Sequence, residues 1–415
     1  MRTRLIAGLV LCFVPPLARG GENLSAEALL PAHGATEAAR PAAAFGKGVY
    51  LVVWEAGRNE NADLVGVRVD RTGKVLDAKP FVVSDAEEEQ ARPRVAFGGG
   101  HFLVVWQDLR NGADYDTYAA RVSVDGKVLD ADGLAIAAAK ENQCQPDVVW
   151  EGTAFQVIWR GYEFRKGDAY DMWGARVSTG GKSLDGAGAM LLERGHRLGK
   201  KYGHPPGVGS NGKGDVVVAA RLGGYVEFQA VRGNKPVGKH LALEHRSHWE
   251  PRFVSDGEKH LALFTTTRPM GRGGTAKVCS GAVLLDPKVV AKGGKTQAVI
   301  ALSTVKTWKG AGVRNPAGAW DGSSYLVAWD MKQGPTGTQG ERAKKWAYDR
   351  VYARRVSKDG KALGEMIPVA GEMASPARHA AAASSGAGAT LLAYEKHPAK
   401  ADEPIRIGFR VLGGE

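Results

Sequence analysis

The chain has 415 residues, of which 44% are apolar, 56 are glycine and three are cysteine, and its formal net charge is +12. An apolar fraction of this size supports a buried core, so the composition excludes a largely disordered chain. Three cysteines are too few for a disulfide framework, and the glycines lack the period of collagen. The length suits either two or three ordinary domains or one large all-β unit.

The first 20 residues have the three parts of an export signal. Arg2 and Arg4 supply a charged start, residues 5–14 form an apolar run, and Ala18 and Gly20 are the small residues expected around a cleavage point. The run is too short to cross a bilayer, and no later stretch is long enough for a transmembrane segment. We therefore predict export to the periplasm or the extracellular space. Three arginines leave with the signal, so the net charge falls from +12 to +9.

A motif that opens on proline and ends on tryptophan recurs along the chain. In its four clearest copies the two residues are 13 positions apart, and these copies begin at Pro41, Pro93, Pro146 and Pro316. Weaker copies begin at Pro206 and Pro251. A seventh copy ends at Tyr394, with Pro376 standing five residues early and an insertion expected over residues 381–389. Repeats of this period are the strongest indication of fold class in the sequence.

Each copy continues into a second segment with the pattern of a hairpin. In the second copy, Tyr118, Ala120 and Val122 alternate on one face before an Asp125-Gly126 turn and another apolar stretch. An Asp-Gly pair between such segments indicates a β-hairpin. Each unit thus predicts four short strands, and its continuously apolar second strand needs cover on both faces. Four-stranded units of about 45–65 residues are typical of a β-propeller.

Seven copies predict an all-β, single seven-bladed β-propeller, with six or eight blades as the alternative. The blades are expected over residues 41–92, 93–145, 146–205, 206–250, 251–315, 316–375 and 376–415. The seventh copy ends before a fourth strand. Residues 21–40, which follow the signal over residues 1–20, are predicted to supply that strand and close the ring. Closure removes the exposed strand edges that invite aggregation.

Two strings of the second copy carry a family resemblance. They read Phe102-Leu-Val-Val-Trp106-Gln-Asp-Leu-Arg-Asn-Gly112 and Tyr115-Asp-Thr-Tyr-Ala-Ala-Arg121-Val. The pattern resembles a repeat of many exported bacterial β-propeller proteins and extends over nearly the whole mature chain. The resemblance implies a propeller fold and export, and it implies no reaction, because most such proteins have no assigned one. The Trp-Asp repeat of intracellular scaffold propellers and the Asp-box of sialidases do not occur.

Two sets of recurring residues are interpreted as structural. The tryptophans are expected to fill the core between neighbouring blades rather than to stack on sugars; they are Trp54, Trp106, Trp159 and Trp329. An aspartate five or six residues before an arginine is expected to form a cross-blade ion pair or a turn hydrogen bond; the pairs are Asp63 with Arg68, Asp116 with Arg121, Asp171 with Arg176, and Asp349 with Arg355. A catalytic group is normally an exception to a repeat, not one of its members.

The residue before each first-strand proline is expected near the channel mouth. These residues are Arg40, Arg92, Gln145, Glu250, Asn315 and Ser375, with His204 before the Pro205-Pro206 pair. Such a ring is either a solvated rim or a set of ligand contacts. A sialidase would need three arginines around the carboxylate of its substrate, and the sequence offers only Arg40 and Arg92 as candidates.

Two links between copies are rich in cations and aromatics, and we expect them on the same face. The candidate ligand-binding residues are Arg92 and Gln145 of the rim, Arg194, His196, Lys200, Lys201, Tyr202 and His204 of the first link, and His245, Arg246, His248, Trp249 and Glu250 of the second. Cations beside aromatics suit a polyanion. The two histidines at i and i+3 in the second link are a weak metal signal, so a basic loop is preferred and neither metal nor cofactor is predicted.

Two functions remain open. The first is an exported, non-catalytic binding or scaffold propeller whose basic face takes a polyanionic glycan, an envelope component or a protein. The second is a carbohydrate-active hydrolase or lyase, which would need two carboxyls about 5–10 Å apart at the channel mouth. The acids expected there are Glu163, Glu244, Glu250 and residues 87–89. No catalytic residue is predicted, since no nucleophile, phosphate-loop or nucleic-acid motif appears.

Overall fold

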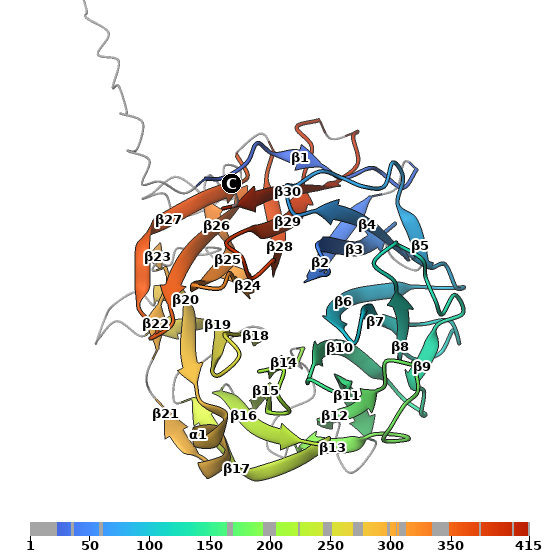
Figure 1. Cartoon of the computed structure of the whole chain (residues 1–415), viewed down its shortest axis with the longest axis vertical. Coiled ribbons are helices and arrows are strands. Elements are labelled where there is room, and N and C mark those ends of the chain that lie inside the picture. The colour runs from blue at the N-terminus through green and yellow to red at the C-terminus, as the bar shows by residue number, and fades with distance from the viewer. Residues whose placement is uncertain are drawn as a thin grey trace, which may run out of the picture.

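A computed structural model of the chain describes residues 23–34, 37–57, 61–163, 169–193, 205–222, 225–243, 251–268, 277–296, 299–303, 305–306, 313–333, 348–372, 375–400 and 402–413. These residues form seven sheets that stand radially around a central axis (Figure 1). Within these ranges a single short helix interrupts the strands. The predicted seven-bladed β-propeller is therefore confirmed.

Four blades consist of four antiparallel strands that run in chain order from the channel outward. Blade 1 contains β2 (Ala38–Gly46), β3 (Val49–Ala56), β4 (Asp63–Asp70) and β5 (Phe81–Ser84). Blade 2 contains β6 (Gln90–Gly98), β7 (His101–Asp108), β8 (Asp116–Val122) and β9 (Leu134–Ala137). Blade 3 contains β10 (Gln143–Trp150), β11 (Phe155–Glu163), β12 (Ala169–Val177) and β13 (Ala189–Leu192). Blade 6 contains β24 (Val313–Trp320), β25 (Ser324–Gln333), β26 (Tyr348–Ser357) and β27 (Ala362–Ala370).

Blades 4 and 5 carry additional short strands. Blade 4 contains β14 (Gly207–Ser210), β15 (Val216–Leu222), β16 (Tyr225–Arg232), β17 (Lys235–Leu243) and, parallel to β17, β21 (Gly294–Thr296). Blade 5 contains β18 (Arg252–Ser255), β19 (His260–Arg268), β20 (Lys277–Leu285), β22 (Ile300–Ala301) and β23 (Val305–Lys306). Helix α1 (Pro287–Lys292) lies between β20 and β21, and the Asp286 carboxylate caps it by accepting from the Lys288 N–H at 2.8 Å.

Blade 7 combines the two ends of the described chain. Its inner strands are β28 (Ala377–Ser384), β29 (Thr390–Lys396) and β30 (Arg406–Leu412), and its outer strand is β1 (Ala28–Leu29). In Figure 1 the blue β1 runs beside the dark red β30. Strand β1 is antiparallel to β30, with Ala28 opposite Phe409. The prediction that the segment before the first repeat closes the ring is therefore confirmed.

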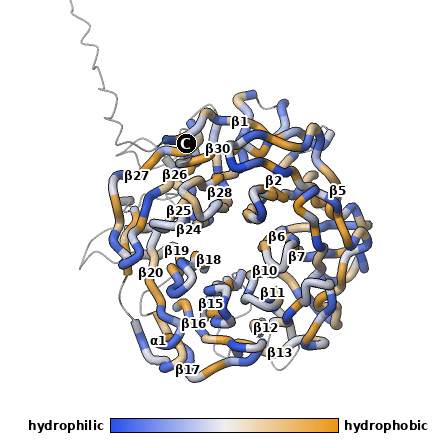
Figure 2. The backbone as a smooth tube through the Cα atoms, viewed as in Figure 1, coloured by the Kyte–Doolittle hydropathy of each residue, from blue (hydrophilic) through white to orange (hydrophobic). Residues whose placement is uncertain are grey.

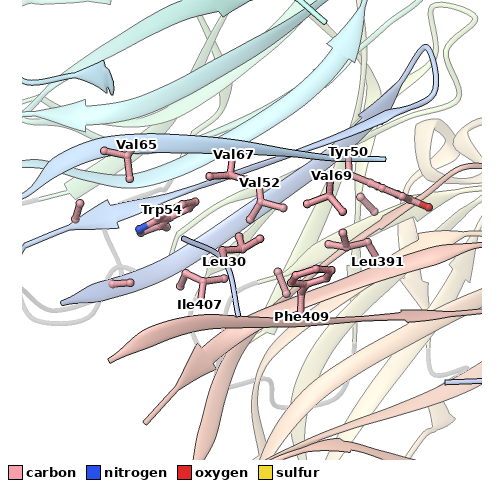
Figure 3. Packing of buried hydrophobic residues seen from close by; sticks show 14 residues of the cluster. Leu30, Tyr50, Val52, Trp54, Val65, Val67, Val69, Leu391, Ile407 and Phe409 are labelled. Atoms are coloured by element: carbon pink, nitrogen blue, oxygen red, sulfur yellow. The ribbon is translucent and has the colours of Figure 1, made fainter. Parts of the chain in front are cut away.

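Seven apolar clusters fill the seven spaces between neighbouring blades. The repeated tryptophans belong to them: Trp54 and Trp159 are 2% exposed, and Trp106 and Trp329 are fully buried. Figure 3 shows the cluster between blades 1 and 7, where Trp54 and Val67 face Ile407 and Phe409. In Figure 2 apolar segments recur in every blade around the ring. The second strands are therefore covered on both faces, as their composition predicts.

The prediction that Asp63, Asp116 and Asp171 pair with the arginines five residues later finds no support where both side chains are described. Arg68 instead pairs with Asp77 at 2.7 Å, and Arg121 pairs with Asp130 at 2.8 Å. Each aspartate stands nine residues after its arginine and belongs to the same blade. Residues five apart on a strand point to opposite faces, because strand side chains alternate. The hairpin that follows brings the later aspartate back beside the arginine.

The same arginines also join neighbouring blades. Arg68 Nη1 donates to the Val124 carbonyl of blade 2 at 3.2 Å, and Arg121 Nη1 donates to the Thr179 carbonyl of blade 3 at 3.1 Å. The cross-blade role that we predicted for this repeat thus belongs to the arginine and a backbone carbonyl. In blade 6 the arrangement changes, since Arg355 pairs with Asp321 and Arg354 donates to the Leu302 carbonyl at 3.0 Å.

Several sequence predictions concern residues outside the described ranges. The signal peptide over residues 1–20 is one of them, so export remains a prediction.

Cys144 is a buried free thiol. None of the helical segments in the described part of the chain has the length and apolarity needed to span a membrane.

Candidate functional site

Five inner strands contain a bulge near their first residues. At each bulge one residue has a left-handed backbone, and we call these five the rim residues: Arg40 (φ 47°), Arg92 (φ 56°), Gln145 (φ 55°), Asn315 (φ 49°) and His379 (φ 53°). Strand pairing skips two residues at each of these points. A left-handed backbone is unfavourable for residues other than glycine, so the surrounding contacts must hold it. Four rim residues were predicted from the sequence.

The fifth rim position corrects the sequence analysis. In blade 7 it belongs to His379 and not to Ser375, whose hydroxyl donates to the His397 carbonyl. Ala380 takes the place of the proline, so Pro376 is not its equivalent. Ala381 pairs with Ala393, 12 residues later, where Ala42 of blade 1 pairs with Val53, 11 residues later. The insertion expected over residues 381–389 is therefore a single residue.

A second set of polar residues lies directly behind the rim. Each follows the buried aromatic residue of its second strand, and we call them the belt residues: Glu55, Gln107, Arg160, Asp330 and Glu395. They are 4%, 7%, 8%, 3% and 2% exposed. The sequence analysis missed them, although their place immediately after Trp54, Trp106, Trp159, Trp329 and Tyr394 is visible in the repeat. Buried charge at a repeated position requires partners.

Belt side chains accept hydrogen bonds from the rim backbone of the next blade. Glu55 Oε1 accepts from the Arg92 N–H at 2.6 Å, and Glu395 Oε1 accepts from the Arg40 N–H at 2.8 Å. Gln107 Oε1 accepts from the Gln145 N–H at 3.3 Å. These bonds stabilise the left-handed rim conformation and join blade 7 to 1, 1 to 2, and 2 to 3.

Rim side chains pair with the belt residue of their own blade. Arg40 Nη1 lies 3.0 Å from both carboxylate oxygens of Glu55, and His379 Nδ1 lies 2.6 Å from Glu395 Oε1. Likewise, Arg160 Nη1 donates to Gln145 Oε1 at 2.6 Å, and Asn315 Nδ2 donates to Asp330 Oδ2 at 2.9 Å. Rim and belt therefore form a hydrogen-bonded band around this end of the channel, which we call the bulge end.

Two belt carboxyls have opposite pKa shifts. Burial would raise the pKa of Glu395, but hydrogen bonds from His379 and His397 hold it well below its usual range. Burial raises the pKa of Asp330 to about 7, and the charge of His379 only partly offsets it. Among the described residues Asp330 Oδ1 has no hydrogen-bond partner. Glu395 is therefore ionised at neutral pH, while Asp330 is close to half protonated.

A cavity of about 180 Å³ opens in the channel beside the rim, and we call it the arginine cavity. Blades 1, 2 and 5 contribute its arginines, which are Arg40, Arg92, Arg94 and Arg252. Asn315, His379 and Phe253 also line it, and the other lining residues are alanine, proline, glycine or valine. Arg252 reaches Asp147 of blade 3, with Nη1 3.2 Å from Oδ2. Among the residues that the structure describes, no carboxylate belongs to the lining.

The structure brings some of the predicted site residues together. Arg92 lines the arginine cavity, and Gln145 belongs to the rim and contacts Arg160. The two-arginine limit set by the sequence is wrong, because Arg94 and Arg252 join Arg40 and Arg92. Arg94 follows Pro93 directly and Arg252 follows Pro251, so the pattern Pro-Arg was the available signal. The remaining predicted residues lie outside the described ranges: Arg194, His196, Lys200, Lys201, Tyr202, His204, His245, Arg246, His248, Trp249 and Glu250.

The acids named for a hydrolase are placed only in part. Glu244 and Glu250 lie outside the described ranges, as does the side chain of Glu163. Glu89 accepts a hydrogen bond from the Tyr115 hydroxyl, and the backbone carbonyls of Glu87 and Glu88 accept from Gln90 Nε2. In the part of the chain that the structure describes, no cluster of three or more His, Cys, Asp or Glu side chains is placed to hold a metal ion.

Comparison with known proteins supports the fold. The structure is similar to a protein of unknown function from Dyadobacter fermentans, with a TM-score of 0.51 and 14% identity over 96% of this chain and 100% of that chain. It is also similar to the GH93 α-L-arabinofuranosidase of Fusarium graminearum solved with arabinobiose, with a TM-score of 0.51 and 9% identity over 94% and 98%. No family model and no curated protein matches the sequence. Likeness at this level of identity shows a shared propeller fold and nothing about activity.

Proposed function

We propose that this protein is an exported, non-catalytic binding propeller that recognises an acidic glycan at the bulge end of its channel. The observation that carries the proposal is the lining of the arginine cavity, to which, among the described residues, four arginines and no carboxylate contribute. A concave surface of one sign concentrates ligands of the opposite sign. The planar fork of arginine matches the two oxygens of a carboxylate.

The buried band behind the cavity supports this role. Glu55 holds the Arg40 guanidinium through both of its oxygens and also holds the Arg92 backbone. Asp147 of blade 3 also holds Arg252, with Oδ2 3.2 Å from Nη1. Side chains that are already ordered lose little conformational entropy when a ligand binds, so the same contacts give a higher affinity.

The basic links predicted from the sequence extend the proposal. Residues 194–204 precede β14 and residues 244–250 precede β18, which are the inner strands of blades 4 and 5. We assign to these links the outer contacts with the glycan, through lysines, histidines and Trp249. Export belongs to the proposal as well, because an acidic envelope or extracellular glycan would be met outside the cytoplasm.

Binding of purified protein to acidic and neutral polysaccharides at increasing salt tests the proposal. We expect binding to acidic polymers that weakens as salt rises, because phosphate, sulfate or carboxylate contacts are screened. A variant with His245→Ala, Arg246→Ala, His248→Ala and Trp249→Ala should bind less, whereas Lys127→Gln, at an exposed turn of blade 2, should bind as the parent does. Equal binding to neutral and acidic polymers, or none to either, would contradict the proposal.

One observation favours the alternative, a carbohydrate-active hydrolase. A general acid needs a pKa near the working pH, and burial raises the pKa of Asp330 to about 7. Release of reducing ends from a panel of polysaccharides, abolished by Asp330→Asn, would establish this function in place of the first. Absence of turnover on substrates that the protein binds would leave the binding function alone.

A further inference from the structure

We infer that the arginine cavity takes one carboxylate-bearing sugar residue at the end of a glycan, rather than a segment within the polymer. This inference rests on the proposed function and adds the form of the ligand. Three features of the cavity carry it: the arrangement of its arginines, the other polar groups between them, and its size.

The cations stand at the two ends of an arc of consecutive blades. Arg252 comes from blade 5, and Arg40, Arg92 and Arg94 come from blades 1 and 2. Arg40 pairs with Glu55 and Arg252 with Asp147. These two carboxylates are 4% and 9% exposed and do not line the cavity. The surface that a ligand meets is therefore cationic, and a carboxylate fits it.

Polar and apolar groups fill the arc between these arginines. Asn315 comes from blade 6 and His379 from blade 7, and both offer hydrogen-bonding groups to the cavity. Phe253 and the small side chains of residues 380–382 supply apolar surface beside them. A ring that carries hydroxyls on its edge and carbon on its face matches this lining, whereas a bare inorganic anion would use only the arginines.

The size of the cavity limits how much of a glycan enters. At about 180 Å³ it is smaller than the roughly 300–1,000 Å³ clefts that enclose drug-sized ligands. The rim residues in its wall are fixed by the belt, as Arg92 is by Glu55, so widening the cavity for a longer segment would break such contacts. One terminal residue fits without such a change.

Calorimetric titration with three small probes tests the inference: glucuronate, glucose and acetate. Glucuronate should bind, while glucose lacks the charge and acetate lacks the ring, and both should bind at least 10-fold more weakly. Arg94→Gln should weaken glucuronate at least 10-fold, since a hydrogen bond to a charged group is lost. Arg92→Gln should do the same, and glutamine fits this backbone because Gln145 has the same left-handed conformation in blade 3. Lys127→Gln is the control with the same loss of charge.

The outcomes separate this inference from the proposed function. Salt-sensitive binding of an acidic polymer that survives Arg94→Gln, with no binding of glucuronate, overturns the cavity assignment and leaves the proposed function standing. Equal affinity for acetate and glucuronate overturns the sugar assignment. Absence of binding to every acidic saccharide overturns both. If an arginine variant fails to fold, the NMR signals of the His379 ring in the parent protein give a second measurement, because only a ligand inside the cavity should shift them on titration with glucuronate.

Discussion

At the scale of single residues, the position after each second-strand aromatic determines how the channel wall is held. Glutamate, glutamine, arginine and aspartate all occur there, and each is buried and bonded to a rim residue. Because the side-chain partners change together, as Glu55 with Arg40 and Arg160 with Gln145, the band tolerates different chemistry from blade to blade. A buried polar group keeps its place if its partner satisfies it.

Asp330 makes stability depend on pH. Its pKa is raised from an ordinary value of 3.8 to about 7, so the folded chain keeps a proton that the unfolded chain has already released. Between pH 4 and pH 7 stability should therefore fall as pH rises, by at most about 1.4 kcal/mol per pH unit. Asp330→Asn should reduce this slope without abolishing it, because burial also raises the pKa of Asp116, to about 6. Guanidinium unfolding at pH 5 and pH 8 will measure the difference. Asp125→Asn, at an exposed turn, is the control, and parallel pH profiles for Asp330→Asn and the parent would contradict the assignment.

At the scale of elements, an arginine of the third strand connects blade 1 to blade 2 and blade 2 to blade 3. Arg121 holds Asp130 through two nitrogens and donates to the Thr179 carbonyl of blade 3. Its side chain is 19% exposed, so water screens the pair only in part. The arginine thus adds a polar contact between neighbouring blades near their outer strands, while the belt joins the same blades near the channel.

Loss of this arginine should lower stability more than loss of an exposed cation nearby. We expect Arg121→Ala to reduce the free energy of unfolding by about 2 kcal/mol, because hydrogen bonds to a charged group are lost and Asp130 is left without its partner. Lys127→Ala on the same hairpin should change it by less than about 0.5 kcal/mol. Urea unfolding followed by tryptophan fluorescence gives both values. Equal effects would assign no energetic role to the contact with blade 3.

Strand patterns in the sequence predicted the elements better than their polar contacts. Proline, tryptophan and the Asp-Gly turns mark where strands begin and end, because strand limits depend on residues that are close in the sequence. The rim residue of blade 7 was not predicted, because His379 is followed by alanine and the sequence analysis relied on proline. Its left-handed backbone is visible only in the structure. The belt escaped because a buried glutamate such as Glu395 is explained only by partners that come from a neighbouring strand and blade.

At the scale of the whole molecule, the ring depends on the segment around β1. Leu30 is 1% exposed and packs in the cluster between blades 1 and 7 (Figure 3), and its N–H donates to the Ile407 carbonyl at 2.9 Å. Glu27 accepts from the Tyr394 hydroxyl at 2.7 Å and pairs with Lys396 at 2.8 Å. A short strand therefore carries both apolar and polar contacts of ring closure.

Two adjacent leucines allow a matched test of that closure. Leu30→Ala should cost about 3 kcal/mol, as truncation of a buried leucine usually does. Leu29→Ala changes a side chain that is 49% exposed and should be nearly neutral. Thermal unfolding of the two variants measures the difference. A similar melting temperature for both would show that β1 contributes little to holding the ring closed.

The pairing of β1 with β30 should also limit the rate of folding. The Gly413 N–H donates to the Asn23 carbonyl at 2.9 Å, so the first and last described residues touch. Strand β30 of blade 7 pairs with β1, which is almost 400 residues away in the sequence, and contacts so distant in sequence form slowly. A circular permutant that joins these ends and opens the link between blades 2 and 3 at the exposed Lys140 would make the same strand pair local. It should refold faster and unfold more readily, because no strand would then be shared between the new ends of the chain.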